Sequence, residues 1–175
     1  MAVLPLRVSC RALLVAVSLA SGGVAVPRHV LASTTLLAVA DPGFADSSGE
    51  PGNQQAAHRE RLKTVAETLR QALARAVPAE VVALSCPADG CEVDQPGVAA
   101  LRERARQKGA ALVLVCGVHK MSTLILSMRV GVLDVATGRL IAERWLSFRG
   151  DTDEGWRRAA EYVAADIAPA IAAAR

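Results

Sequence analysis

Residues 111–118 form an uninterrupted apolar run, and this run constrains the fold more than any other feature of the 175-residue chain. A short and continuously apolar segment is typical of a central strand that is covered on both faces. Because such a strand needs helices packed on the sheet around it, the run by itself favours an α/β domain.

The rest of the chain supplies the other elements of such a domain. Apolar or alternating runs predict further strands at residues 36–41, 81–84, 124–134 and 140–148. Apolar residues spaced by three and four predict helices at residues 57–76 and 96–109 and from residue 149 onward, where Pro169 is expected to kink or end the helix. Residues 44–55 are rich in Gly, Ser, Asp and Pro and are expected to form a loop. The predicted order is β-α-β-α-β-β-β-α, a single α/β domain with helices packed on one mixed sheet.

The last predicted helix has a recognisable start. Asp151 is expected to cap the free backbone amides, and Glu154 is expected to reach back as in a capping box. Beyond them, a stripe at helical spacing predicts the buried face of this helix: Trp156, Ala160, Val163 and Ile167.

Residues 1–32 have the composition of a cleavable export signal. Arg7 and Arg11 supply the positive charge, residues 13–26 supply the apolar segment, and Ala32 is the small residue before the expected cleavage site. The apolar segment is interrupted by Gly and is short for a membrane span of about 20 residues. Cleavage after Ala25 or Val26 and a retained anchor are the alternatives. We expect residues 33–175 to fold in the periplasm, without stable insertion in a membrane.

Removal of this segment changes the charge of the chain. The full sequence has 20 Lys and Arg against 17 Asp and Glu, and the charged residues of the first 32 are Arg7, Arg11 and Arg28. Residues 33–175 therefore carry 17 charges of each sign. A neutral chain with two Trp, one Tyr and two Phe offers neither a basic patch nor a stacking platform, so nucleic acid is not expected as a partner.

Three cysteines remain after the signal. Cys86 and Cys91 lie in a loop-like stretch, and an exported protein meets an oxidising compartment in which such a pair forms a disulfide. A metal site lacks further ligands at suitable spacing, and a redox pair usually has two residues between its cysteines rather than four. Cys116 lies inside the apolar run and is expected to be a small core residue.

No catalytic constellation, phosphate-binding loop or cofactor motif is recognisable, so we expect no cofactor and no metal. The candidate contact residues for a ligand or a partner follow the predicted central strand or lie on the last strand: His119, Lys120, Ser122, Trp145 and Arg149. The end of a central strand is where α/β proteins often bind ligands.

Several blocks carry a resemblance: DSSGE at residues 46–50, HRERL at 58–62, HKMSTLIL at 119–126, DVATG at 134–138 and RGDTDEGWR at 149–157. With the Cys86 and Cys91 pair, they resemble a family of small exported bacterial proteins known only as a domain of unknown function. The chain departs from the pattern of that family at Gly155 and Cys116. The element order is also similar, more loosely, to the N-terminal domain of the envelope protein TolB.

These resemblances imply a non-enzymatic binding or accessory module of the cell envelope, with another envelope protein as its partner. Family members often occur beside genes for quinoprotein alcohol oxidation, which suggests an accessory role there. The alternative is a small-molecule-binding or catalytic domain that uses His119, Lys120 and residues 46–50. A redox role for Cys86 and Cys91 is a third hypothesis.

Overall fold

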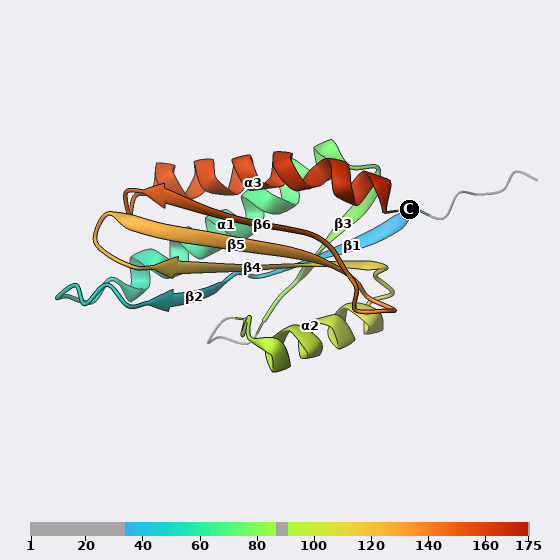
Figure 1. The fold of residues 1–175 in the computed structure, drawn as a ribbon, viewed down its shortest axis with the longest axis horizontal. Helices are drawn as coiled ribbons and strands as arrows, with labels where there is room; N and C mark the ends of the chain where they lie inside the picture. The colour runs from blue at the N-terminus through green and yellow to red at the C-terminus, as the bar shows by residue number, and fades with distance from the viewer. Residues whose placement is uncertain (1–33, 87–90, 175) are drawn as a thin grey trace, which may run out of the picture. The chain divides into compact units, whose positions relative to one another are not determined.

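The computed structural model describes residues 34–86 and 91–174, and the predicted signal lies outside these residues. Helices lie on both faces of one mixed sheet, which confirms the predicted α/β class (Figure 1). The elements in chain order are β1 (Thr35–Ala40), β2 (Gly43–Asp46), α1 (Gln55–Ala76), β3 (Ala79–Leu84), α2 (Gln95–Gln107), β4 (Leu112–Lys120), β5 (Ile125–Asp134), β6 (Leu140–Arg149) and α3 (Asp153–Ala173).

The sheet has the order β3-β1-β4-β5-β6, with β2 paired to β4 off this path. β1 runs parallel to both β3 and β4, whereas β4, β5 and β6 form an antiparallel meander. The apolar run of residues 111–118 therefore lies in a central strand, as its composition predicts, and β4 is paired along both edges.

Strand β2 corrects the prediction of a loop from residue 44 onward. β1 pairs with the start of β4 and β2 pairs with its end, and the two are separated by Asp41 and Pro42. Proline cannot donate to a ladder, so pairing is interrupted there and resumes at Gly43. The stretch is polar because β2 is short and its last residues are exposed.

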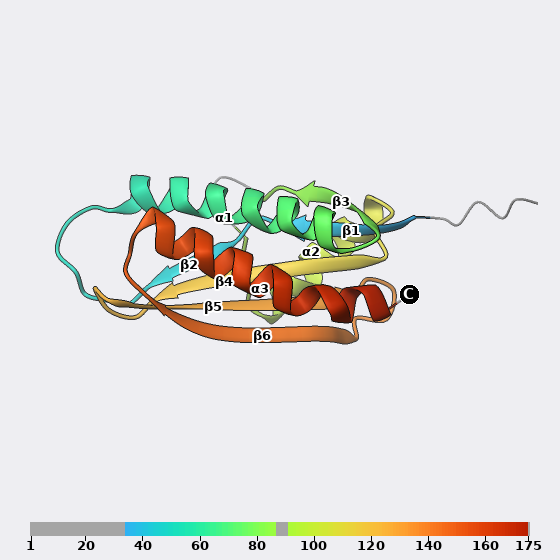
Figure 2. The same ribbon diagram turned by 90° about the horizontal axis from the view of Figure 1, so that it is seen from above.

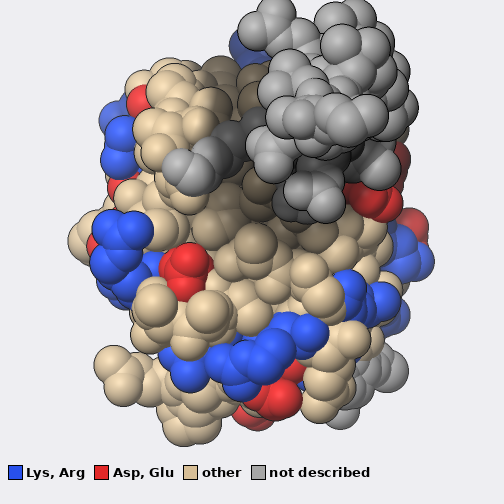
Figure 3. All heavy atoms as spheres, turned by 90° about the vertical axis from the view of Figure 1, so that its right-hand side faces the viewer, with Lys and Arg blue, Asp and Glu red and all other residues tan. Residues whose placement is uncertain are grey.

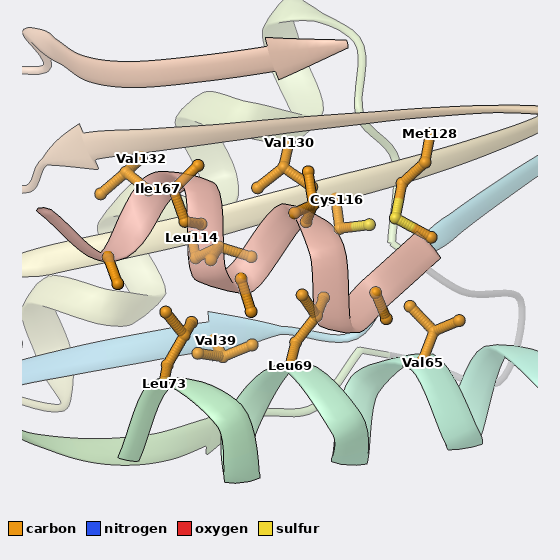
Figure 4. Packing of buried hydrophobic residues seen from close by; sticks show 14 of the residues in the cluster. Val39, Val65, Leu69, Leu73, Leu114, Cys116, Met128, Val130, Val132 and Ile167 are labelled. Atoms are coloured by element: carbon orange, nitrogen blue, oxygen red, sulfur yellow. The ribbon is translucent and has the colours of Figure 1, made fainter. Parts of the chain in front are cut away.

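Helices α1 and α3 cover one face of the sheet and α2 covers part of the other (Figures 1 and 2). Figure 4 shows the larger core, in which Leu69 of α1 and Ile167 of α3 face the sheet residues Leu114 of β4 and Val130 of β5. Cys116 is buried in this core as a free thiol, as expected.

Helix α3 carries the predicted stripe, with Trp156 fully buried. It does not end at Pro169 but continues to Ala173. None of the helices in the described part of the chain is long and apolar enough to cross a membrane.

The α2 side of the sheet is only partly covered. Leu101 and Ala105 of α2 pack on residues of β1 and β4 such as Ala38 and Val113. Farther along the sheet, Trp145 of β6 is 73% exposed. We call the α2 side of β5 and β6 the open face; its side chains include Ile125, Arg129, Leu140, Glu143 and Trp145.

A β-bulge sets which side chains of β6 reach the open face. Val132 pairs with Ala142 and Leu133 pairs with Leu140, so Ile141 is an extra residue. Ile141 packs against the larger core, and Leu140 is left exposed on the other side.

Candidate functional site

The end of β4 separates His119 from Lys120. Successive side chains of a strand point to opposite faces, and Lys120 shares its face with the buried residues Cys116 and Val118. His119 lies on the other face, where its Nε2 is 2.7 Å from the Oγ of Ser47. A ligand role for these two residues stays a prediction, but one small ligand cannot contact both side chains from the same side of the sheet.

Lys120 is buried, with 1% of its side chain exposed. Its Nζ lies 2.8 Å from Oδ2 of Asp151 and 2.9 Å from Oε1 of Gln54, and it also contacts the carboxylate of Glu50. Burial works against the charged form, but Asp151 and Glu50 outweigh it and raise the pKa of Lys120 above its ordinary value. The ammonium therefore has an acceptor for each of its three hydrogens.

Asp151 is the centre of this arrangement. Besides Lys120, it accepts from Nη1 of Arg61 at 2.6 Å and from Nε1 of Trp156 at 3.0 Å, and its Oδ2 lies 2.8 Å from Nε2 of His58. Burial alone would raise the pKa of Asp151. The hydrogen bonds from its neighbours, first that of His58, outweigh burial and lower the pKa to about 2.

We call these residues the Asp151 cluster: Glu50, Gln54, His58, Arg61, Lys120, Asp151 and Trp156. They come from the end of β4, the starts of α1 and α3 and the loop before α1, which lie at one end of the sheet (Figures 1 and 2). Aromatic rings pack beside them. The centroid of His58 is 4.6 Å from that of Phe44 and 5.9 Å from that of Trp156.

The Asp151 cluster is a saturated polar network. Within residues 34–86 and 91–174, no buried side-chain nitrogen or oxygen lacks a hydrogen-bond partner. A pocket of about 480 Å³ lies beside the cluster and is lined in part by Phe44, Glu50 and His58. In the same described residues, no three His, Cys, Asp or Glu side chains are placed to hold a metal. The arrangement ties α1, β4 and α3 together through shared hydrogen bonds and ion pairs.

The remaining predicted contact residues do not join this cluster. Ser122 belongs to the turn between β4 and β5, where its Oγ accepts from the backbone of Ile125 at 3.1 Å. Trp145 lies on the open face, and Arg149 is exposed at the end of β6. The structure thus distributes the five candidates over two faces and one turn.

The cap of α3 differs from the prediction. Thr152 is the N-cap, and its Oγ1 accepts from the backbone of Gly155 at 3.2 Å. Asp151 turns instead toward His58, because the positive and N–H groups gathered there stabilise a carboxylate better than one backbone amide. Glu154 pairs with Arg157 and Arg158 and does not reach back.

Sequence reasoning did not assign His58 and Arg61 to a site. His58 lies on the apolar face of α1, at helical spacing from Leu62 and Val65, and a histidine in that position needs a buried partner. Nothing in the local pattern indicates that this partner is Asp151.

Cys86 and Cys91 form the predicted disulfide, with their Cα atoms 5.3 Å apart. Cys116 takes no part in it. Burial raises the pKa of its thiol to about 12, so the group stays protonated and unreactive at neutral pH.

The sequence matches, over residues 35–167, the family DUF3280, which carries the description "Protein of unknown function (DUF2380)". The chain belongs to this family. The match covers most of the described domain, and the resemblance inferred from the sequence blocks is confirmed. No curated protein matches this DUF3280 chain significantly.

Some solved structures are loosely similar to the DUF3280 chain. PelC from Paraburkholderia phytofirmans, described as a dodecamer, is 16% identical, with a TM-score of 0.49 and coverage of 78% of this chain and 87% of PelC. The C-terminal domain of LpoB from Salmonella enterica is 19% identical, with a TM-score of 0.44 and coverage of 65% and 81%. TolB from Acinetobacter baumannii is 12% identical, with a TM-score of 0.46, and the similarity covers 80% of this chain and 29% of TolB.

Proposed function

We propose that this chain is a non-enzymatic binding module of the bacterial cell envelope, which after export holds a partner protein on its open face. The exposure of Trp145 carries the proposal. A tryptophan that is 73% exposed on a sheet face leaves a large apolar surface in water. Tryptophan is also the residue type most enriched among the anchors of protein interfaces.

The surroundings of Trp145 support the same function. Leu140 and Ile125, also on the open face, are 49% and 41% exposed, and the Arg129–Glu143 ion pair lies among them. Aromatic residues and arginine are both enriched in protein interfaces. The saturated Asp151 cluster, by contrast, gives no support to a catalytic role.

The disulfide supports export. Cys86 and Cys91 would stay reduced in a cytosol and become oxidised in the periplasm. Because family members often occur beside genes for quinoprotein alcohol oxidation, a periplasmic quinoprotein dehydrogenase is the first partner to test.

The test is photo-crosslinking in the periplasm of the native host, with p-benzoylphenylalanine in place of Trp145. Tyr162 is the matched control position, since it is another exposed aromatic residue, 66% exposed, but belongs to α3 in the opposite layer. We expect a covalent adduct with one envelope protein from position 145 and none from position 162. Monomer alone from both positions, under growth with and without alcohols, would contradict the proposal.

Recovery of the partner protein with alanine variants measures how much Trp145 contributes to binding. Trp145→Ala is expected to lower recovery of the co-purified partner by about tenfold or more, the loss typical of an interface anchor. Tyr162→Ala should leave recovery unchanged. Equal losses from both variants would show that the interface is not on the open face.

A further inference from the structure

A groove of about 560 Å³ runs between α2 and the open face. One wall is a single face of α2, on which Val98, Ala99 and Arg102 follow each other at helical spacing. The floor belongs to β4 and β5, and Leu140 and Glu143 of β6 form the far wall. Its volume is in the range of pockets that hold small organic ligands.

The floor of the groove contains two glycines in neighbouring strands. Gly117 of β4 pairs with Arg129, and Gly131 of β5 pairs with Val115, so both lie in the floor. A Cβ at Gly117 would lie 3.1 Å from a methyl group of Val93, and a Cβ at Gly131 would lie 3.5 Å from Leu140. The space over Gly117 is thus already taken by Val93, whereas a larger residue at Gly131 would project into the groove.

The lining is apolar except for Gln95 and four charged side chains, and three of the charged side chains are engaged. Arg129 donates to Glu143 at 2.6 Å, and Asp94 caps α2 by accepting from the backbone of Gly97 at 2.8 Å. Arg102 is half-buried and forms no ion pair or hydrogen bond with the described residues. Its guanidinium lies over Gly138 in the β5–β6 turn, at one end of the groove.

The surface at this end is basic. Figure 3 shows the side of the molecule at which α2 ends and the β5–β6 turn lies, and Lys and Arg side chains form a band across it. The last turn of α2 contributes Arg104, which donates to the backbone of Ser85, and Arg106, which is paired with Glu103. An anionic group is therefore attracted to the end of the groove where Arg102 lies.

The floor cannot pair with a peptide backbone. β4 is paired with β1 and β2 on one edge and with β5 on the other, and β5 lies between β4 and β6. Because these backbone groups are used in the sheet, an extended peptide lying across the groove would lose hydrogen bonds to water without replacement. A hydrocarbon chain has no such groups to lose.

We propose that this groove binds an amphiphilic monocarboxylate of the fatty-acid type. The hydrocarbon chain lies over Gly131, in contact with the apolar side chains Val98, Val115, Leu133 and Leu140, and the carboxylate pairs with Arg102. One guanidinium balances the single charge of a carboxylate, whereas a phosphate monoester would keep excess negative charge. This site shares Arg129, Leu140 and Glu143 with the open face, but we infer it without relying on the protein partner proposed above.

The test is isothermal titration of the chain, purified from the periplasm, with octanoate, decanoate and dodecanoate below their micelle concentrations. We expect saturable binding of one molecule, with Kd falling by about fourfold for each added methylene group. Dodecyltrimethylammonium, which has the same chain and the opposite charge, should not bind. If dodecanoate shows no saturable binding up to about 1 mM, the proposal is wrong.

Variants locate the site. Arg102→Gln should weaken dodecanoate binding by about tenfold, as expected for the loss of a charge-assisted hydrogen bond. Lys108→Gln, which removes the same charge just after α2, should leave binding unchanged. Gly131→Val should abolish binding by filling the floor, and circular dichroism would establish that it folds. Binding that survives both Arg102→Gln and Gly131→Val would overturn the proposal.

Sedimentation velocity tests the alternative that a second copy of the chain, rather than a fatty acid, occupies the groove. We expect a monomer at micromolar concentration, with and without dodecanoate. A dimer that Gly131→Val dissociates would assign the groove to an interface between copies and would also overturn the proposal. The crosslinking experiment at position 145 does not depend on any of these results.

Discussion

The imidazole Nε2 of His58 lies 2.8 Å from Oδ2 of Asp151, although 93 residues separate the two in the chain. His58 is in the first turns of α1, and Asp151 immediately precedes the cap of α3. The contact therefore fixes the start of one long helix against the start of another. Lys120 ties both to the end of β4 through the same carboxylate.

Asp151→Asn is expected to destabilise the fold by about 3–5 kcal/mol, because it leaves the buried charge of Lys120 and the half-buried charge of Arg61 without their shared anion. Urea unfolding followed by circular dichroism would measure the loss. The matched control is Asp153→Asn. Asp153 also pairs with Arg61, but its side chain is 87% exposed, so the cost should be below about 1 kcal/mol. Equal costs would show that burial does not decide the strength of these pairs.

The lowered pKa of Asp151 in the folded protein predicts how the free energy of unfolding depends on pH. This pKa is about 2 in the folded protein against an ordinary 3.8, so the folded state favours the ionised form. The resulting stabilisation, about 2 kcal/mol, is fully present above about pH 5 and is lost as the pH falls through 2. Urea unfolding at intervals between pH 6 and pH 2 should show this loss in the wild type. The Asp151→Asn variant should show a shallower dependence, and an unchanged slope would contradict the assignment.

The sequence predicted the parts of this fold that depend on local pattern. Residues 111–118 indicated the central strand, and the Trp156 stripe indicated the buried face of α3, because each depends only on how apolar residues repeat. β2 could not be predicted in this way. Its four residues form a strand because the second half of β4 has an unpaired edge beside them, which is a property of the assembled sheet.

The Asp151 cluster shows a second limit. Lys120 lies on the same side of β4 as the buried residues Cys116 and Val118, so the alternation of side chains along a strand places it on the buried face. A lysine at the end of a strand is nevertheless usually exposed. Asp151 has a strong local role available as a helix cap. Contacts with residues far away in the chain decide both the burial of Lys120 and the orientation of Asp151. Local sequence patterns do not contain this information.

Replacement of both disulfide cysteines, Cys86→Ser with Cys91→Ser, should lower the free energy of unfolding by about 2 kcal/mol, the chain-entropy estimate for so short a loop. Reduction of the wild type should produce the same loss and should not affect the variant. Iodoacetamide should leave the native protein unlabelled, since burial keeps the remaining thiol, Cys116, protonated. Rapid labelling of native Cys116 would contradict this account.

The two tryptophans provide a matched test of the open face. Trp156 is fully buried between α1, α3 and the sheet, so Trp156→Ala should cost about 3–5 kcal/mol by leaving a large cavity. Trp145→Ala should change stability by less than about 1 kcal/mol, because its ring is in water before and after the substitution. Guanidinium unfolding followed by circular dichroism would compare the two, since fluorescence changes with the tryptophans themselves. A cost at Trp145 as large as that at Trp156 would mean that the open face is covered in the isolated protein, and the partner proposed for it would then have no surface to bind.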